Sequence, residues 1–230
     1  MENLTVIVPF LNEEKFLRDS VKRLIQIDSE VKIFLFNDCS TDNSKQIAVE
    51  LAKKYQNIEY FENKKQKGKG NTISKASKLI KTKYVAIHDA DLEYFPEDLK
   101  EMYKKIIQNE DALILGSRFI GNKKIDNIYA RTLIANKVMS YFFSIIHFYK
   151  ISDIATCYKM MPTKFLKKIN INEKGFAVEV EILSKYLKYK KLIIEVPIKY
   201  AGRSYKDGKK IKSLDGIEYI FKTLKYRFFD

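Results

Sequence analysis

An apolar run that ends abruptly in carboxylates constrains the fold of this chain more than any other stretch. Tyr84 to Ile87 has the pattern of a short buried strand, and Asp89 and Asp91 follow directly behind His88. Carboxylates at the exit of a buried strand are costly unless a positive charge lies there. In open α/β sheets, ligands bind at the carboxyl ends of the strands. The pattern therefore predicts a parallel sheet with a ligand site at this edge.

Asp89 and Asp91 form a D-x-D pair, which is a candidate metal site. Alternating side chains on a straight strand face apart, so the two aspartates can meet one ion only where the backbone bends. One or two carboxylates, completed by phosphate oxygens and water, are the usual ligands of Mg²⁺ or Mn²⁺. We expect this pair to hold a metal–diphosphate. The triplet alone is a weak signal, and the alternative is that its acids are solvated or lie at the start of the next helix, near Pro96.

The flanking sequence alternates short apolar runs with amphipathic segments, which predicts an α/β protein with a doubly wound, mostly parallel sheet flanked by helices. The expected strands of the first half span residues 5–10, 31–36, 58–61, 84–87 and 112–115. Asp38 and Arg118 fall just past strand ends, as the D-x-D pair does, which is typical of a nucleotide crevice. Neither G-x-G-x-x-G nor G-x-x-x-x-G-K-[ST] occurs, so dinucleotide oxidoreductases and P-loop ATPases fit poorly.

The second half of the chain has a different pattern, with long apolar and amphipathic helical stretches. We expect a strand at 153–161, an amphipathic helix at 176–189, a strand at 192–200 and a C-terminal amphipathic helix at 214–229. Residues 138–148 are apolar nearly all round but too short to span a membrane, so they are either buried or lie at a membrane interface. The last helix mixes apolar and basic residues, which suits a membrane surface or docking on the core. No linker or repeat divides the chain, so residues 1–230 are expected to form one domain.

Composition narrows the class of partner. The 43 Lys and Arg residues exceed the 29 Asp and Glu residues, which gives a net charge of +14 and favours nucleic acid, nucleotide phosphates or an acidic membrane surface. Cys39 and Cys157 form no C-x-x-C motif, so neither a disulfide framework nor a zinc site is indicated. The polar start lacks the pattern of a signal peptide, and no uncharged run approaches the roughly 18–20 residues of a membrane span. We expect a cytoplasmic protein.

Eight stretches taken together resemble the successive motifs of family 2 glycosyltransferases. They are VIVPFLNEE, FNDCSTDNS, KGKGNTISKA, HDADLEYFPEDL, LGSRF, DIATCYKMMP, FAVEVEILSK and VPIKYAGRSYKDGKKI. The branch that they resemble most is the dolichyl-phosphate mannosyltransferase-like, or polyprenyl-phosphate glycosyltransferase, group, and the match runs from about residue 5 to 212 in the right order. The resemblance implies a Rossmann-like GT-A fold, with residues 1–120 binding the nucleotide sugar and residues 121–230 binding the acceptor.

The resemblance also implies an activity and a set of site residues. The activity is inverting transfer of a sugar from a nucleotide sugar of the GDP-mannose or UDP-glucose type to a polyprenyl or dolichyl phosphate, with Mg²⁺ or Mn²⁺. The implied positions are Pro9, Leu11 and Glu13 at the base, Asp38 at base or ribose, Asp89, Asp91 and Glu93 at the metal, Arg118, Arg131, Asn136 and Ser140 at the acceptor phosphate, and Arg203 and Lys210 over the donor diphosphate. Asp91, Arg118 and Arg131 are expected to carry catalysis.

The nature of the acceptor separates the leading hypothesis from its rivals. A hydroxyl acceptor needs a general base, whereas a phosphate monoester is already anionic at neutral pH. Related hydroxyl-modifying enzymes often carry a Glu-Asp pair, but this chain has Glu179 and Glu181 in Ala-Val-Glu-Val-Glu. That favours a lipid phosphate over a hydroxyl in cell-envelope polysaccharide synthesis. A non-catalytic basic module is the third reading, and no nucleic-acid partner is expected.

A lipid acceptor requires access to a membrane. Several members of the resembling group carry membrane helices after the catalytic domain, and this chain stops without them. We therefore expect peripheral contact with the inner face of the cell membrane, or a separate membrane-protein partner. For Arg118 and Arg131 the alternative is an ordinary surface cation or ion-pair partner. His88 is expected to be a hydrogen-bonded strand-end residue rather than a metal ligand, because oxygen ligands suit Mg²⁺.

Overall fold

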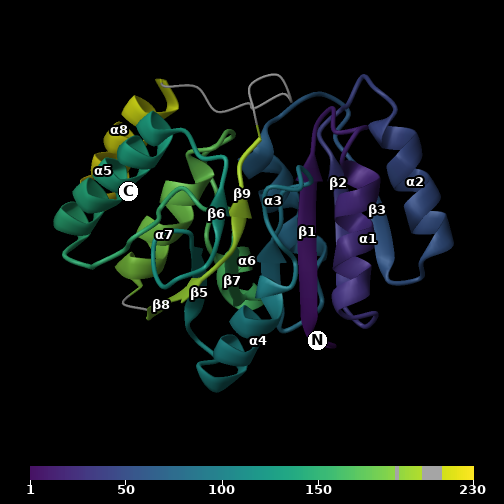
Figure 1. The fold of residues 1–230 in the computed structure, drawn as a ribbon, viewed down its shortest axis with the longest axis horizontal. Coiled ribbons are helices and arrows are strands. Elements are labelled where there is room, and N and C mark those ends of the chain that lie inside the picture. The colour runs from purple at the N-terminus through teal and green to yellow at the C-terminus, as the bar shows by residue number, and fades with distance from the viewer. Residues whose placement is uncertain (190–191, 204–213) are drawn as a thin grey trace.

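A computed structural model gives the structure of this protein and describes residues 1–189, 192–203 and 214–230. A seven-stranded sheet runs through its centre with the order β3-β2-β1-β4-β7-β5-β8 (Figure 1). The strands are β1 Leu4–Phe10, β2 Lys32–Asn37, β3 Ile58–Glu62, β4 Tyr84–Ile87, β5 Leu113–Ser117, β7 Lys159–Pro162 and β8 Ile193–Pro197. β7 is antiparallel to β4 and β5, and the other pairings are parallel. The predicted mostly parallel α/β sheet is confirmed.

Helices cover both faces of this sheet, because successive strand residues point to opposite sides. Val6 and Val8 pack with α1, α2 and α4 on one face, whereas Ile7 packs with α3, α5, α6 and α7 on the other. The helices are α1 Leu17–Ile27, α2 Ser44–Lys54, α3 Lys69–Leu79, α4 Asp98–Gln108, α5 Ala130–His147, α6 Thr163–Lys168, α7 Val178–Lys188 and α8 Leu214–Phe228. The result is a three-layer arrangement with one core on each side of the sheet.

A small second sheet lies across the carboxyl edge of the large one. β6, Ile125–Asp126, pairs in parallel with β9, Tyr200–Ala201. Tyr200 also forms a bridge with Tyr94, and the Ala201 amide donates to the Glu93 carbonyl at 2.9 Å. These contacts hold the chain that follows β9 beside the exit of β4. Arg203 is placed there by this pairing.

α5 and α8 lie side by side at the end of the molecule where the chain ends (Figure 1). The inner side of α5 buries Met139 and Phe143 in the core, yet its outer side is also apolar. Burial, one of the two alternatives expected for residues 138–148, is confirmed for the inner side of the helix, and a membrane interface at its outer side stays a prediction. The exposed apolar residues are Ile134, Val138, Tyr141, Ile145 and Phe148 of α5 and its end, with Ile217, Phe221, Phe228 and Phe229 of α8 and its end, and together they form the α5–α8 apolar face. None of the described helices is long and apolar enough to span a bilayer.

Candidate functional site

A cavity of about 370 Å³ opens at the carboxyl edge of the sheet. It forms there because the parallel strands β1, β2, β4 and β5 all end at this edge, so the loops that follow them converge. Many of the residues predicted for the site line this cavity. They are Pro9, Leu11, Glu13, Asp38, Asp89, Asp91, Glu93, Arg118 and Arg203.

The backbone bends behind β4, as the D-x-D pair requires. The strand ends at Ile87, and Leu92 adopts a left-handed conformation with φ of 63°. The Glu93 amide donates to Asp91 Oδ1 at 3.2 Å, which fixes this turn. Asp89 and Asp91 therefore both line the cavity instead of facing apart. The structure thus brings the two aspartates together, and their role at a ligand site stays a prediction.

Asp89 is paired with a lysine that the sequence did not single out. Lys69 Nζ lies 2.7 Å from Asp89 Oδ1 and 2.9 Å from Glu179 Oε1. Burial opposes the ionised form of Asp89, but the charge of Lys69 holds the pKa of that carboxyl below its ordinary value. Burial likewise opposes the charge of Lys69, but Asp89 and Glu179 raise its pKa well above the usual range. Both groups are therefore ionised at neutral pH.

Asp91 lies among like charges and one arginine. Arg203 contacts Asp91 Oδ2 at 3.0 Å and Glu13 Oε2 at 3.2 Å. Glu93 accepts hydrogen bonds from the Arg203 amide at 2.8 Å and from the Tyr200 hydroxyl at 2.6 Å. Burial, and then the charges of Glu93 and Asp89, raises the pKa of Asp91 well above its ordinary value. This part of the cavity favours additional positive charge.

Asp38 organises the glycine-containing loop beside the cavity. Its Oδ1 accepts from the Asn63 side chain at 2.7 Å and the Lys67 amide at 2.9 Å, and its Oδ2 accepts from the Gly68 amide at 2.7 Å. Gly68 has a φ of 89°, which a side chain would strain. Lys69 follows as the first residue of α3, so Asp38 also helps to place that lysine.

Arg118 is held by a carboxylate. Its Nε and one terminal nitrogen each lie 2.7 Å from an oxygen of Asp153, and its guanidinium lies over the Tyr200 ring at 4.9 Å. Burial opposes its charge, but Asp153 raises the pKa of Arg118 well above the usual range. Arg118 therefore lines the cavity as a fixed positive charge. It is an ion-pair partner, which is the alternative that the sequence left open for it.

Three residues predicted for the acceptor do not line the cavity. Arg131, Asn136 and Ser140 all lie on α5. Ser140 Oγ donates to the Asn136 carbonyl at 2.8 Å and accepts from the Ile154 amide at 3.1 Å, so it ties α5 to the following loop. Arg131 is exposed near the start of the helix. Lys210 lies outside the described residues. Their roles stay predictions.

His88 forms two hydrogen bonds inside the protein. Its Nε2 lies 3.0 Å from Ser20 Oγ, and its Nδ1 lies 2.9 Å from the Tyr158 hydroxyl. Burial lowers the pKa of His88 to about 4, so the ring is neutral at physiological pH. Both ring nitrogens are used by the fold, which confirms the expected structural role.

The donor atoms around the D-x-D pair suit a hard cation that also binds a ligand. Among the residues that the structure describes, no group of three or more His, Cys, Asp or Glu side chains could hold a metal ion by itself. Asp89 and Asp91 nevertheless offer oxygen ligands, and each already attracts a cation of the chain. Two carboxylates completed by phosphate oxygens are an ordinary Mg²⁺ or Mn²⁺ site. The residues present fit such an ion.

Sequence reasoning missed the buried charges behind Asp89. Lys159 is fully buried and binds Glu179, whose other oxygen meets Lys69. In the sequence, Glu179 stands out only as part of a motif that lacks a Glu-Asp pair. The signal for Lys69 was its place between two glycines, Gly68 and Gly70, because such a loop brings the backbone close to its neighbours.

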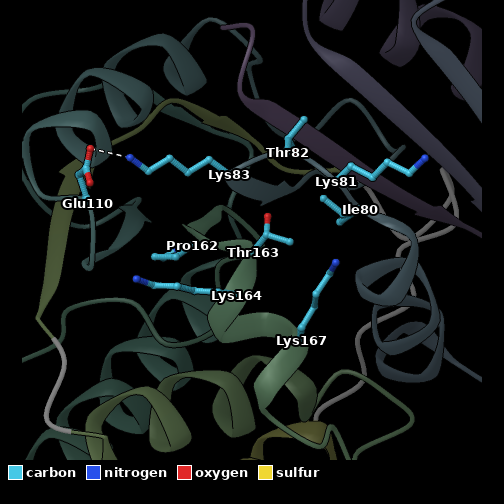
Figure 2. Close-up of a pocket in the computed structure, with 9 residues that line it drawn as sticks. All are labelled: Ile80, Lys81, Thr82, Lys83, Glu110, Pro162, Thr163, Lys164 and Lys167. Atoms are coloured by element: carbon cyan, nitrogen blue, oxygen red, sulfur yellow. Dashed lines mark hydrogen bonds and ion pairs between the residues drawn. The ribbon is translucent and has the colours of Figure 1, made fainter.

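A second cavity, of about 290 Å³, lies away from these residues (Figure 2). It is lined by the lysines Lys81, Lys83, Lys164 and Lys167, together with one carboxylate, Glu110. Lys83 reaches across to Glu110 at 2.6 Å, and Lys164 contacts Asp111 at 2.8 Å (Figure 2 draws the first pair). It contains none of the residues predicted for function, and its lysines suit the solvated surface of a lysine-rich chain. The candidate site is therefore the cavity at the carboxyl edge.

Known proteins resemble this chain over most of its length. A family model described as glycosyl transferase family 2 matches residues 5–169. Dolichol-phosphate mannosyltransferase of Pyrococcus furiosus is 26% identical over 97% of this chain and 64% of its own length, so the chain spans less than two thirds of that relative. UDP-N-acetylglucosamine–dolichyl-phosphate N-acetylglucosaminyltransferase of Methanococcus voltae is 24% identical over 95% of this chain and 94% of its own.

Solved structures show the same fold. Glucosyl-3-phosphoglycerate synthase from Mycobacterium tuberculosis, solved with Mn²⁺, UDP-glucose and phosphoglyceric acid, superposes with a TM-score of 0.75 at 14% identity. The match covers 98% of this chain and 79% of the other. At this identity the likeness shows the GT-A fold alone. The family model, however, covers most of the chain. The protein is therefore a glycosyltransferase and belongs to glycosyl transferase family 2.

Proposed function

We propose that this glycosyltransferase moves a hexose from a nucleotide sugar, of the GDP-mannose or UDP-glucose type, onto a polyprenyl or dolichyl phosphate. Transfer inverts the anomeric centre and uses Mg²⁺ or Mn²⁺. The names of two relatives support a dolichyl-phosphate acceptor, and the structural neighbour solved with Mn²⁺ and UDP-glucose supports the donor class and the ion.

One observation carries the choice of a phosphate acceptor over a hydroxyl. Every carboxylate that lines the cavity contacts a cation or a backbone amide of the described chain, so each is already engaged. These carboxylates are Glu13, Asp38, Asp89, Asp91, Glu93 and Glu179. A hydroxyl acceptor needs a free base to take its proton, and a carboxylate already engaged by a cation or backbone amides is poorly placed for that role. Asp91, whose pKa is raised, is the carboxylate that we assign to the metal ion. A phosphate acceptor needs none.

The bond changes then balance without a proton acceptor. A phosphate monoester has a second pKa of about 6 and is largely dianionic at neutral pH. Its oxygen attacks the anomeric carbon, and the bond from that carbon to the donor diphosphate breaks. The nucleoside diphosphate leaves with the electron pair. The protein has to align the two phosphates and stabilise the negative charge that develops on the leaving group.

The D-x-D pair would hold the ion at the donor diphosphate. A divalent ion there supplies positive charge that stabilises the leaving nucleoside diphosphate. Arg203 and Lys69 lie beside Asp91 and Asp89, so their charges are available to the same diphosphate. The Pro9–Glu13 segment lines the same cavity and would frame the base, and Asp38 would stand between base or ribose and the loop that it organises.

The acceptor phosphate would be met by arginines. Arg118 offers a fixed positive wall, because Asp153 holds its guanidinium in place. Arg131 lies near the amino end of α5, where negative charge is favoured, and would act at the membrane side of the acceptor. Asn136 and Ser140 lie further along the same helix and would act with it. Lys210, outside the described residues, is proposed to cover the donor diphosphate.

The α5–α8 apolar face supports contact with a membrane. Contiguous apolar patches are uncommon on monomeric soluble proteins and mark interaction surfaces. Exposed basic residues lie on the same two helices and beside them, which suits an interface with acidic lipid headgroups. They are Lys137, Lys150, Lys225 and Arg227. We propose peripheral attachment at the inner face of the cell membrane, where a lipid phosphate would reach the cavity; a separate membrane protein covering this face is the alternative.

The test is transfer of labelled sugar to a short-chain polyprenyl phosphate. GDP-mannose, UDP-glucose and UDP-N-acetylglucosamine are offered separately, with Mg²⁺, Mn²⁺ or a chelator. We expect metal-dependent product from one donor, and Asp91→Asn should lower it at least about 100-fold. Asp19→Asn, which changes an exposed carboxylate of α1, is the control that should retain activity. Donor hydrolysis without lipid product would contradict the proposed lipid-phosphate acceptor. Equal product in the presence of chelator would contradict the proposed metal dependence.

A further inference from the structure

Each aspartate of the D-x-D pair already carries a cation supplied by this chain. Lys69 Nζ is 2.7 Å from Asp89 Oδ1, and a terminal nitrogen of Arg203 is 3.0 Å from Asp91 Oδ2. Opposite charges at such distances attract strongly in a partly buried site. A divalent ion that binds these carboxylates has to compete with both side chains.

The two cations are anchored differently. Lys69 also contacts Glu179, and Glu179 is held from behind by the fully buried Lys159. Lys69 therefore keeps a partner when Asp89 turns to another cation. Among the residues that the structure describes, Arg203 forms ion pairs only with carboxylates of the cavity. Its buried Nε lies 3.7 Å from Glu93 Oε1 and forms no hydrogen bond to these residues. A buried N–H without a hydrogen bond is costly, so this guanidinium gains from an added acceptor oxygen.

The charges around Asp89 and Asp91 do not balance. This imbalance links binding of the metal ion to binding of the diphosphate. Among the described residues, five carboxylates, namely Glu13, Asp89, Asp91, Glu93 and Glu179, meet three cations, namely Lys69, Lys159 and Arg203. The excess negative charge opposes a diphosphate that arrives without a metal ion. The two cations in turn oppose a metal ion that arrives without a diphosphate. Binding of the metal ion therefore reduces the electrostatic repulsion that opposes the diphosphate, and binding of the diphosphate does the same for the metal ion.

We infer that Lys69 and Arg203 are built-in counter-ions of the D-x-D pair that couple metal binding to diphosphate binding. Before nucleotide binds, they neutralise Asp89 and Asp91. The diphosphate offers them new oxygens, and arginine in particular suits phosphate geometry. Asp89 and Asp91 then become available to the divalent ion. The inference rests on the proposed nucleotide-sugar site and adds Lys69 to it as a positioning residue.

The experiment measures binding of Mn²⁺ rather than turnover. Free Mn²⁺ is titrated by electron paramagnetic resonance, with the full chain alone and with saturating GDP or UDP. The variants are Arg203→Met and Lys69→Met, with Arg203→Lys as the charge-conserving rescue. Lys65→Met is the matched control, because Lys65 is an exposed lysine of the loop that precedes α3. Circular dichroism establishes that each variant is folded, and Arg203→Met keeps the test decisive if the Lys69 variant is not.

The expected result is reciprocal coupling. In the unmodified chain, nucleoside diphosphate should tighten Mn²⁺ binding about tenfold or more, which is the usual size of such couplings. Arg203→Met should tighten Mn²⁺ binding in the absence of nucleotide and shrink the nucleotide effect to about twofold, while Arg203→Lys and Lys65→Met keep it. A purely structural role would not tighten metal binding. An equal nucleotide effect in all variants overturns the coupling alone. Absence of both Mn²⁺ and nucleotide binding in the folded chain overturns the proposed function as well.

Discussion

Arg118 and Asp153 meet through two nitrogen–oxygen contacts of 2.7 Å, and the Arg118 amide adds a third to the same carboxylate at 3.1 Å. Asp153 is fully buried, and Arg118 is 6% exposed. The pair joins the end of β5 to the loop that follows α5, two parts of the chain that are 35 residues apart. It therefore fixes one wall of the cavity as well as placing a charge there.

Removal of the Asp153 side chain should destabilise the protein more than removal of any exposed charge. Asp153→Ala leaves the Arg118 guanidinium buried without its carboxylate, so we expect the free energy of unfolding to fall by about 3–5 kcal/mol. Urea denaturation followed by circular dichroism measures the change. The control is Glu50→Ala, which breaks an exposed pair with Arg18 and should cost about 1 kcal/mol or less. Similar losses for both variants would show that the buried pair contributes no special stability.

Gly70, the second residue of α3, has no room for a side chain. A Cβ added there would lie 2.0 Å from the Glu173 carbonyl oxygen, which belongs to the backbone and cannot turn aside. We expect Gly70→Ala to lower the free energy of unfolding by about 2–4 kcal/mol and to weaken nucleotide binding, because Lys69 moves with the loop.

Gly175 provides the matched control for that substitution. A Cβ added to Gly175 meets nothing within 4 Å, although this glycine lies in the segment that packs against Gly70. Gly175→Ala should change the free energy of unfolding by no more than about 0.5 kcal/mol. Thermal unfolding of both variants, with nucleotide binding measured in parallel, makes the comparison. Unchanged stability of Gly70→Ala would mean that the loop has room to move.

The sheet could be predicted where the sequence pattern is local. β4 begins and ends at the predicted residues, because a buried strand appears as an unbroken apolar run bounded by polar residues. The strand expected at 153–161 is wrong for most of its length, because only Lys159–Pro162 forms a strand. Its antiparallel insertion between β4 and β5 depends on long-range pairing, which an apolar pattern does not encode.

The site could be predicted in its residue types but not in its partners. Asp89 and Asp91 stand out because carboxylates behind an apolar strand are unusual. Their partners lie 20 and 112 residues away, and Lys69 looks like any other lysine in a chain with 43 basic residues. Asp38 was expected at the base or ribose, and its three bonds to the 63–68 segment emerge only from the folded loop.

His147 should make the protein sensitive to acid. Its ring stacks on Phe143 at 4.2 Å and its Nε2 lies 3.1 Å from Ser184 Oγ. Burial, and then the charge of Arg227, lowers the pKa of His147 to about 4. Between pH 6.5 and 4 the unfolded chain binds a proton that the folded chain does not, so stability is lost as the pH falls through this range.

A substitution isolates this contribution from that of other groups. His147→Gln removes the titrating ring. Between pH 7 and 5, the free energy of unfolding of this variant should fall by about 1–2 kcal/mol less than that of the unmodified chain, after allowance for solvent near the ring. Ser184→Ala keeps the ring and should keep the full pH dependence. Urea titrations at several pH values provide the measurement. An unchanged slope in His147→Gln would place the acid sensitivity elsewhere, for instance at His88.

The α5–α8 apolar face should bind acidic bilayers. Val138, Tyr141 and Ile145 are 49–70% exposed on one side of α5, and Phe221 of α8 is 65% exposed. Insertion of such side chains into the interface releases roughly 1.5 kcal/mol or more for each one fully buried. Replacing the three α5 residues with Ser should therefore weaken binding to vesicles containing phosphatidylglycerol by about 100-fold or more.

Cosedimentation with vesicles distinguishes binding through this face from nonspecific hydrophobic adsorption. The control replaces Leu79, Ile107 and Leu192 with Ser, because these residues are 45–52% exposed but lie outside the α5–α8 apolar face. The control should bind as the unmodified chain does, and both proteins should bind neutral vesicles more weakly, since the basic residues beside the face then lose their anionic partners. Unchanged melting temperatures exclude unfolding as the cause. Equal loss in the two triple variants would contradict a specific membrane surface. Retention of binding by the α5 variant would assign attachment to another part of the chain, and the lipid phosphate would then have to approach the cavity from a different side.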